Sequence, residues 1–109
     1  LNNTNNRLTK VGRYFYTQKQ KGRINMNFGQ AIEEAKRGKK IARKGWNGKG
    51  QYVELATNVS YKSPNGTVTN VNHEDMGNKA LAFVGTSGVQ LGWLASQADM
   101  LSEDWQTID

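Results

Sequence analysis

The chain has 109 residues, 36% of them hydrophobic, with a formal net charge of +6, one histidine and no cysteine. This length suits one domain and is short for two separate hydrophobic cores. The lack of cysteine excludes disulfides and thiolate sites, and a single histidine excludes a multi-histidine metal centre. No apolar run approaches the roughly 20 residues that a membrane helix needs, and no signal-peptide core is present, so we expect a cytosolic protein.

The positive charge is concentrated in residues 1–25, an Asn-rich segment with six Lys or Arg residues and no acidic residue. Residues 26–109 contain nine basic and nine acidic residues and are electrically balanced. We interpret 1–25 as a disordered or weakly docked basic leader, followed by a single domain over 26–109. Two alternatives stay open for the leader: an arm that binds nucleic acid, or a stretch translated from a ribosome-binding sequence, with the native protein starting at Met26.

Residues 27–37 predict an amphipathic helix. Asn27 suits the N-cap, with Gln30 as its capping-box partner, and Gly38 suits the position just past the C-cap. An apolar stripe follows the i, i+3, i+4, i+7 spacing at Phe28, Ala31, Ile32 and Ala35. We expect this helix to cover the core.

The middle of the domain predicts antiparallel strands joined by tight turns. The dipeptide Asn47-Gly48 predicts a type I′ hairpin between strands over 41–46 and 51–56, because both central residues of that turn need positive φ. Two further hairpins are expected, with strands at 59–61 and 67–71 around the turn at 63–66, and at 80–84 and 89–93 around the turn at 85–88.

The C-terminal part predicts a short helix and a last strand. Residues 72–79 are polar and are expected to form a loop, Ser96 suits an N-cap with Asp99 as its capping-box partner, and 105–108 suit an edge strand. The predicted fold class is therefore α+β: an N-terminal helix packed on an antiparallel sheet of hairpins, with a short C-terminal helix. A core this small gains apolar burial by self-association, so we expect a homo-oligomer.

The segment 42–50 (ARKGWNGKG) combines cations, an aromatic ring and glycines. Arg43 and Lys44 are able to neutralise phosphate, and Trp46 is able to stack on a base. The order of residues is not that of a P-loop. The alternative, which composition by itself favours, is a hairpin with Trp46 in the core and both cations solvated.

A second cluster, in segment 92–105, places three acidic residues within six positions: Asp99, Glu103 and Asp104. Such a group suggests an acid–base pair or a site for a hard cation. The alternative that we favour assigns Asp99 to helix capping and the other two carboxylates to solvent. Ser96 and Gln97 would then be able to hydrogen-bond the ribose or base edge of a ligand.

Nucleophilic catalysis has little support in the sequence. No Gly-x-Ser-x-Gly elbow is present, and the single candidate base, His73, falls in the polar loop, where we interpret it as solvated. The sequence therefore indicates binding rather than an enzyme.

Three motifs carry a resemblance to a known family: MNFGQAIE at 26–33, ARKGWNGK at 42–49 and GWLASQADMLSEDW at 92–105. In this order they resemble the second class of Thoeris anti-defense proteins, small proteins of phages and prophages that were long a domain of unknown function. The resemblance covers residues 26–109 and not the leader, and the loop over 57–79 is its variable part.

The resemblance implies a protein that binds a cyclic ADP-ribose-type signal, glycocyclic ADP-ribose, and sequesters it without cleavage. It also implies an oligomer, characteristically a homotetramer, with the pocket between subunits and, in some members, separate sites for cyclic oligonucleotides. No catalytic residue, metal, cofactor or membrane partner is expected. The alternative is a phage or prophage nucleic-acid-binding accessory protein that acts through the leader. The candidate ligand-binding residues are Arg43, Lys44, Trp46, Asn47, Trp93, Ser96, Gln97 and Asp99.

Overall fold

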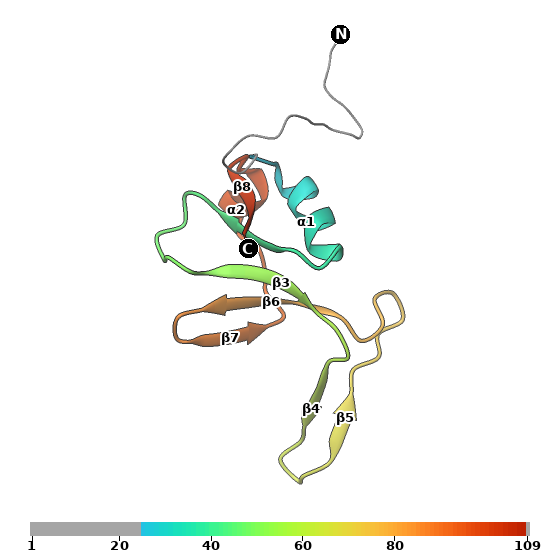
Figure 1. The fold of residues 1–109 in the computed structure, drawn as a ribbon. Coiled ribbons are helices and arrows are strands. Elements are labelled where there is room, and N and C mark those ends of the chain that lie inside the picture. Colours follow the sequence, from blue (N-terminus) through green and yellow to red (C-terminus); the bar gives the residue numbers. More distant parts are fainter. Residues whose placement is uncertain (1–24, 109) are drawn as a thin grey trace.

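The computed structural model of the chain describes residues 25–108, so the leader lies outside the described residues except for Asn25. The predicted α+β class is confirmed, with an N-terminal helix, an antiparallel sheet and a short C-terminal helix (Figure 1). In chain order the elements are α1 (Phe28–Lys36), β2 (Lys40–Arg43), β3 (Tyr52–Ala56), β4 (Ser60–Lys62), β5 (Val68–Asn70), β6 (Ala80–Gly85), β7 (Gly88–Leu91), α2 (Gln97–Leu101) and β8 (Trp105–Ile108).

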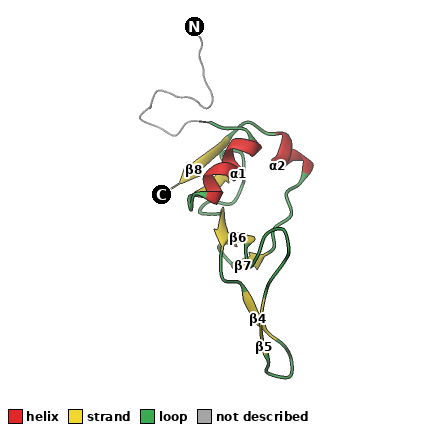
Figure 2. Cartoon of the chain, turned by 90° about the vertical axis from the view of Figure 1, so that its right-hand side faces the viewer, coloured by secondary structure: helices red, strands yellow, loops and turns green. Residues whose placement is uncertain are grey.

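Five strands form one antiparallel sheet in the order β7-β6-β3-β2-β8, and β4 and β5 form a separate two-stranded ribbon. The ribbon projects from the end of the domain that is remote from both helices (Figures 1 and 2). The predicted last strand, β8, pairs with β2 along its whole length. On the side of β8 away from β2, its first residue, Trp105, exchanges two backbone hydrogen bonds of 2.8 and 3.1 Å with Met26, and these bonds tie the start of the domain to its end.

The predicted N-terminal helix is confirmed together with its caps. The Asn27 side chain accepts a 2.8 Å hydrogen bond from the backbone N–H of Gln30, and the Gln30 side chain accepts a 3.0 Å bond from the N–H of Asn27. Gly38 follows the C-cap with φ of 93°, a left-handed conformation that costs glycine little. The capping signals therefore define both helix ends.

The core lies between α1 and one face of the sheet. Ala31 and Ala35, from the predicted stripe, are fully buried against three fully buried side chains of the sheet: Ile41, Val53 and Trp105. Trp105 is the largest of them, a place in the core that the sequence did not predict for it. Because opposed residues share a face, Phe83, which lies opposite Val53, points to this same side of the sheet.

The predicted type I′ turn at Asn47-Gly48 is wrong. β2 ends at Arg43 and β3 begins at Tyr52, and positive φ in this connection is found at Gly50, not at Asn47 or Gly48. The chain leaves β2 early because Asp104 holds it: the N–H of Lys44 donates to the Asp104 carbonyl at 3.0 Å, and the N–H of Gly45 donates to its carboxylate at 2.8 Å. A wide loop replaces the hairpin.

The hairpin of β6 and β7 forms as predicted around the turn at 85–88, but β7 ends at Leu91 rather than at Trp93. Gly92 adopts φ of 85°, and the N–H groups of Gly92 and Trp93 both donate to the carbonyl of Leu81, at 2.8 and 3.0 Å. This glycine turns the chain out of the edge strand and directs Trp93 toward the aromatic side of the sheet. The short helix α2 follows, with the predicted Ser96–Asp99 capping box present.

Candidate functional site: an aromatic pocket beside the core

A pocket of about 330 Å³ opens beside the core, between the β2–β3 loop, β6 and the start of α2. Four of the predicted site residues line it: Trp46, Asn47, Trp93 and Asp99. Three residues that were not among the predicted ligand-binding residues line it as well: Gly48, Gln51 and Phe83. The volume is at the small end of the range for pockets that hold small molecules.

Aromatic rings dominate the pocket wall. Trp93 and Phe83 lie nearly parallel, with ring centroids 6.4 Å apart and planes inclined by 20°. Trp46 meets both rings edge-on, with its centroid 6.2 Å from Trp93 and 5.5 Å from Phe83. Its other neighbour is the buried Trp105, at 5.3 Å. Trp46 is therefore half-buried between core and pocket, and the two alternatives for this residue, core packing and ligand contact, are not exclusive.

Asp99 accepts hydrogen bonds from several residues that surround these rings. Its Oδ1 accepts from the indole Nε1 of Trp46 and from a terminal nitrogen of Arg43, both at 3.0 Å. Its Oδ2 accepts from the N–H of Ser96 at 3.2 Å, and its backbone carbonyl accepts from the indole of Trp105 at 2.8 Å. Burial by itself would raise the pKa of Asp99, but the hydrogen bonds outweigh burial and hold the pKa below its ordinary value.

The guanidinium of Arg43 lies between two carboxylates. Its Nε donates to Asp104 at 2.9 Å and its terminal nitrogen donates to Asp99 at 3.0 Å, and the Arg43 side chain is only 17% exposed. These bonds, first to Asp104 and then to Asp99, raise the pKa of Arg43. Burial would raise the pKa of Asp104, but the bonds from Arg43 and from the backbone of Gly45 lower it instead. This positive charge is compensated within the protein.

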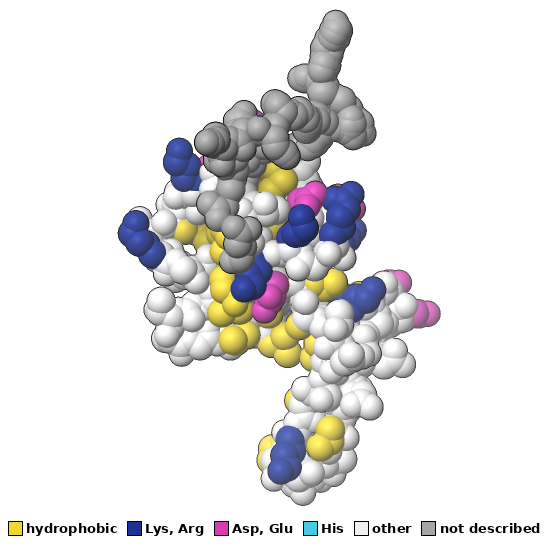
Figure 3. Space-filling model, in the orientation of Figure 1, with side chains coloured by type: hydrophobic (Ala, Val, Ile, Leu, Met, Phe, Trp, Pro, Cys, Tyr) yellow, Lys and Arg dark blue, Asp and Glu magenta, His cyan; other side chains and the backbone are white. Residues whose placement is uncertain are grey.

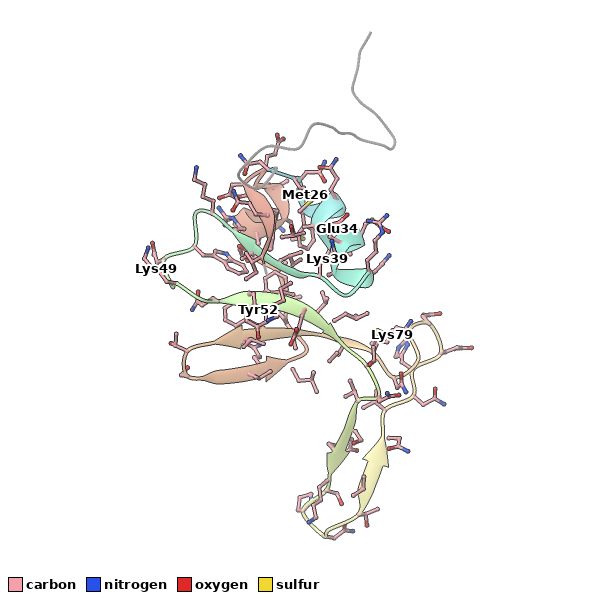
Figure 4. All side chains as sticks on the ribbon, in the orientation of Figure 1. Met26, Glu34, Lys39, Lys49, Tyr52 and Lys79 are labelled. Carbon is pink, nitrogen blue, oxygen red and sulfur yellow. The ribbon has the colours of Figure 1, made fainter. Side chains whose placement is uncertain are left out.

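The predicted site residues thus fall into two groups. Trp46, Asn47, Trp93 and Asp99 meet at the pocket, whereas the other four do not line it. Lys44 is exposed on the β2–β3 loop, and Ser96 and Gln97 are exposed at the start of α2. Farther along the loop, Lys49 lies at its outer tip and points away from the sheet (Figure 4).

The structure agrees only in part with the predicted roles of the three acidic residues Asp99, Glu103 and Asp104. Asp99 caps α2 as expected, and Glu103 is exposed. The expected solvation of Asp104 is wrong, because both of its carboxylate oxygens hold the start of the β2–β3 loop through Arg43 and Gly45. The acid–base alternative also loses support, because Asp99 and Glu103, four positions apart, would share a helix face only if the helix reached Glu103, and α2 ends at Leu101.

Outside the pocket, His73 is exposed in its loop, where its ring accepts a 3.1 Å hydrogen bond from the backbone of Asp75. Among residues 25–108, no three His, Cys, Asp or Glu side chains are grouped so that they would hold a metal ion. No helix in that part of the chain is long and apolar enough to cross a membrane.

Two pocket residues that were not predicted, Phe83 and Gln51, carry only weak signals in the sequence. Phe83 reads as an ordinary strand residue, and its place in the pocket depends on the register of β6 against β3. Gln51 follows the loop whose course was predicted wrongly. The one signal for Gln51 is that it follows Trp46 closely in the sequence, with two glycines between them that allow the chain to fold back.

Comparison with known proteins assigns the family. Residues 26–108 match the model of the Thoeris anti-defense 2-like domain. The chain is also similar to Thoeris anti-defense 2 of Bacillus phage SP01, with 34% identity over 86 residues, which cover 76% of this chain and 94% of the phage protein. The match includes all three sequence motifs and every element of the pocket, so this chain belongs to the Thoeris anti-defense 2-like family.

Proposed function

We propose that this protein binds and sequesters a cyclic ADP-ribose-type signal, glycocyclic ADP-ribose, and so blocks Thoeris defence in the cytoplasm of the bacterial host. The family supports a role against Thoeris defence. The observation that supports the ligand class is the pocket, where three aromatic rings and two side-chain amides surround about 330 Å³. Stacking of a base on an aromatic ring contributes about 1–3 kcal/mol to binding.

We further propose that the signal is held without being cleaved. Asp99 is the carboxylate that lines the pocket, and both of its oxygens already accept hydrogen bonds from the protein. A general acid at neutral pH needs a raised pKa, whereas the pKa of Asp99 is lowered. Its role in this account is to fix Trp46 and the start of α2 around the ligand.

The ligand proposal is tested by calorimetric titration with glycocyclic ADP-ribose, cyclic ADP-ribose, ADP-ribose and a short duplex DNA, each at low and high salt. We expect the glycocyclic signal to bind with less salt dependence than the DNA, because a small dianion displaces far fewer counterions than a duplex. Binding of the DNA alone, with affinity that falls steeply as salt rises, would instead support the nucleic-acid-binding alternative.

Two neighbouring variants locate the site. Trp93→Ala removes a pocket ring and should weaken binding about 5- to 150-fold, the equivalent of ~1–3 kcal/mol. Leu94→Ala is the matched control, because Leu94 is 88% exposed next to it in the chain, and this variant should bind like the parent. Equal binding by both variants would remove the pocket from the proposal.

We also propose that the protein is a homo-oligomer, with a tetramer as the expected state. The face of the sheet opposite α1 supports self-association. Tyr52, Val84 and Val89 form one row across it, and the next row consists of Glu54, Ala82 and Leu91, with Ala82 buried. Val89 and Leu91 are 64% and 50% exposed on the edge strand β7, and apolar surface is visible over the sheet and on the ribbon (Figure 3). An uncharged, apolar edge strand readily pairs with a further strand.

Light scattering tests this interface. The parent should have a mass about four times 12.2 kDa, and Val89→Lys combined with Leu91→Lys should lower it. Gln90→Lys is the matched control, because Gln90 lies between them on the same strand and points to the other face. A monomeric parent would contradict the oligomer, and an unchanged mass of the double variant would exclude this face.

A further inference from the structure

Gln51 has a side chain whose position depends on a glycine. A Cβ added at Gly48 would overlap Cδ, Nε2 and Oε1 of Gln51, so the amide of Gln51 lies directly against the backbone of Gly48. The φ of Gly48 is not in the left-handed region, so backbone conformation does not require a glycine there. The space that the missing side chain leaves is taken by the Gln51 amide.

This amide is a hydrogen-bonding group without a partner in the described part of the chain. Gln51 is half-buried and lines the pocket with Trp46, Trp93 and Phe83, yet within residues 25–108 its side chain makes no hydrogen bond. The charged groups nearby are already engaged, since Asp99 accepts from Trp46, Arg43 and Ser96. The pocket therefore offers flat apolar surfaces and a neutral donor–acceptor pair, which suit a nucleobase better than a phosphate.

We propose that the pocket takes the adenine of the ligand, and that the Gln51 amide, positioned by the missing side chain at Gly48, reads its hydrogen-bonding edge. A side-chain amide presents one donor and one acceptor side by side. Adenine presents the complement, an amino group beside a ring nitrogen, and Gln pairs with adenine in this bidentate way. The inference rests on the proposed function, because it assigns a part of that ligand to this pocket.

A substitution at Gly48 tests the proposal, because it displaces the Gln51 amide without removing it. In Gly48→Ala the overlap is with the far end of a flexible side chain, so the Gln51 amide must move while the fold is kept. The matched control is Gly85→Ala, whose Cβ would lie at ordinary contact distances, 3.5 Å from Phe83 and 3.8 Å from the Gln51 amide. Thermal melts of both variants should match the parent.

Calorimetric titration with glycocyclic ADP-ribose gives the main readout. Gln51→Ala and Gln51→Glu should weaken binding roughly 5- to 150-fold, the range for loss of a bidentate base contact. Gly48→Ala should weaken binding to a similar degree, and Gly85→Ala should bind within about twofold of the parent, since it leaves the contact in place.

A second probe separates base reading from a general structural effect. The same ring compound with a 1,N6-etheno base retains the flat surface but lacks the amino hydrogens. The parent should bind it roughly 5- to 150-fold more weakly than the adenine form, and Gln51→Ala should bind both forms alike. Gln51 variants that bind like the parent, or a Gln51→Ala that keeps the preference for adenine, would overturn the inference and leave the proposed function standing. A parent that binds neither probe would overturn both.

Discussion

The indole of Trp46 donates a 3.0 Å hydrogen bond to Oδ1 of Asp99, across 53 positions of the chain. The same oxygen accepts from Arg43, and the backbone of Asp99 accepts from Trp105. Two of the motifs noticed in the sequence are therefore joined by one carboxylate. Asp99 orients Trp46, which in turn contacts both the core and the pocket.

Trp46 should show separable effects on stability and on binding. Trp46→Phe keeps a ring against Trp105 but loses the bond to Asp99, so we expect the free energy of unfolding to fall by about 1 kcal/mol. Trp46→Ala also removes the packing and should cost about 3–5 kcal/mol. Urea unfolding at pH 7 measures both. A fully stable Trp46→Ala variant would show that the ring is not part of the core.

Asp104 and Glu103 offer a matched pair of neighbouring acids. Asp104→Asn weakens the bonds to Arg43 and Gly45, and because the Asp104 side chain is 28% exposed we expect a loss of roughly 1–3 kcal/mol of stability. Glu103→Gln should leave stability within about 0.5 kcal/mol of the parent, because Glu103 is exposed. Chemical denaturation compares the two, and equal losses would refute the structural role of Asp104.

Acid should destabilise the domain through the same carboxylates. The pKa values of Asp99 and Asp104 are lower in the folded chain than the ordinary value of 3.8, so the unfolded chain takes up protons first as the pH falls. Their contribution is complete above about pH 5 and is lost as the pH falls through about 4 toward the folded pKa values. Urea unfolding at pH 7, 5, 4 and 3 measures this loss. Asp99→Asn and Asp104→Asn should each make it shallower, and a variant with the parent's slope would contradict this assignment.

The chain should fold without residues 1–24. The contacts that hold the start of the domain begin at Asn25, whose side chain accepts a 2.9 Å hydrogen bond from Gln106, and at Met26, which pairs with Trp105. Residues 25–109 should therefore keep the fold, as judged by circular dichroism, and form an oligomer with the same number of subunits as the full chain. A further cut to residue 28 should destabilise the domain, because it removes Met26 and the Asn27 cap. A shorter chain that is unfolded when only 1–24 are missing would contradict this view.

The sequence predicted correctly those elements that depend on interactions between residues close together in the chain. The caps and stripe of α1, the turn at 85–88 and the capping box of α2 all act within a few residues, and the structure confirms them. The Asn47-Gly48 turn failed because the carboxylate of a distant residue, Asp104, takes the backbone N–H of Gly45, while the N–H of Lys44 continues the pairing of β2 toward β8. Turn propensity carries no information about such a partner.

The sequence predicted part of the candidate site, for the same reason. Trp46 and Trp93 stand out by residue type, and both reach the pocket. Phe83 and Gln51 do not stand out, since their place depends on strand register and on the course of a loop. Arg43 was expected to bind phosphate, but its charge is neutralised by two carboxylates, those of Asp99 and Asp104. The fold places these carboxylates beside it, and the local sequence carries no sign of them.

The most direct test of the central claim is to trap the signal and recover it. The protein is incubated with glycocyclic ADP-ribose, separated from unbound compound by gel filtration and heated to unfold it, and the released compound is identified by mass spectrometry. We predict that the intact signal is recovered in proportion to the protein, with much less from Trp93→Ala than from Leu94→Ala. Recovery of no signal, or of a cleaved product above the level in buffer, would contradict it.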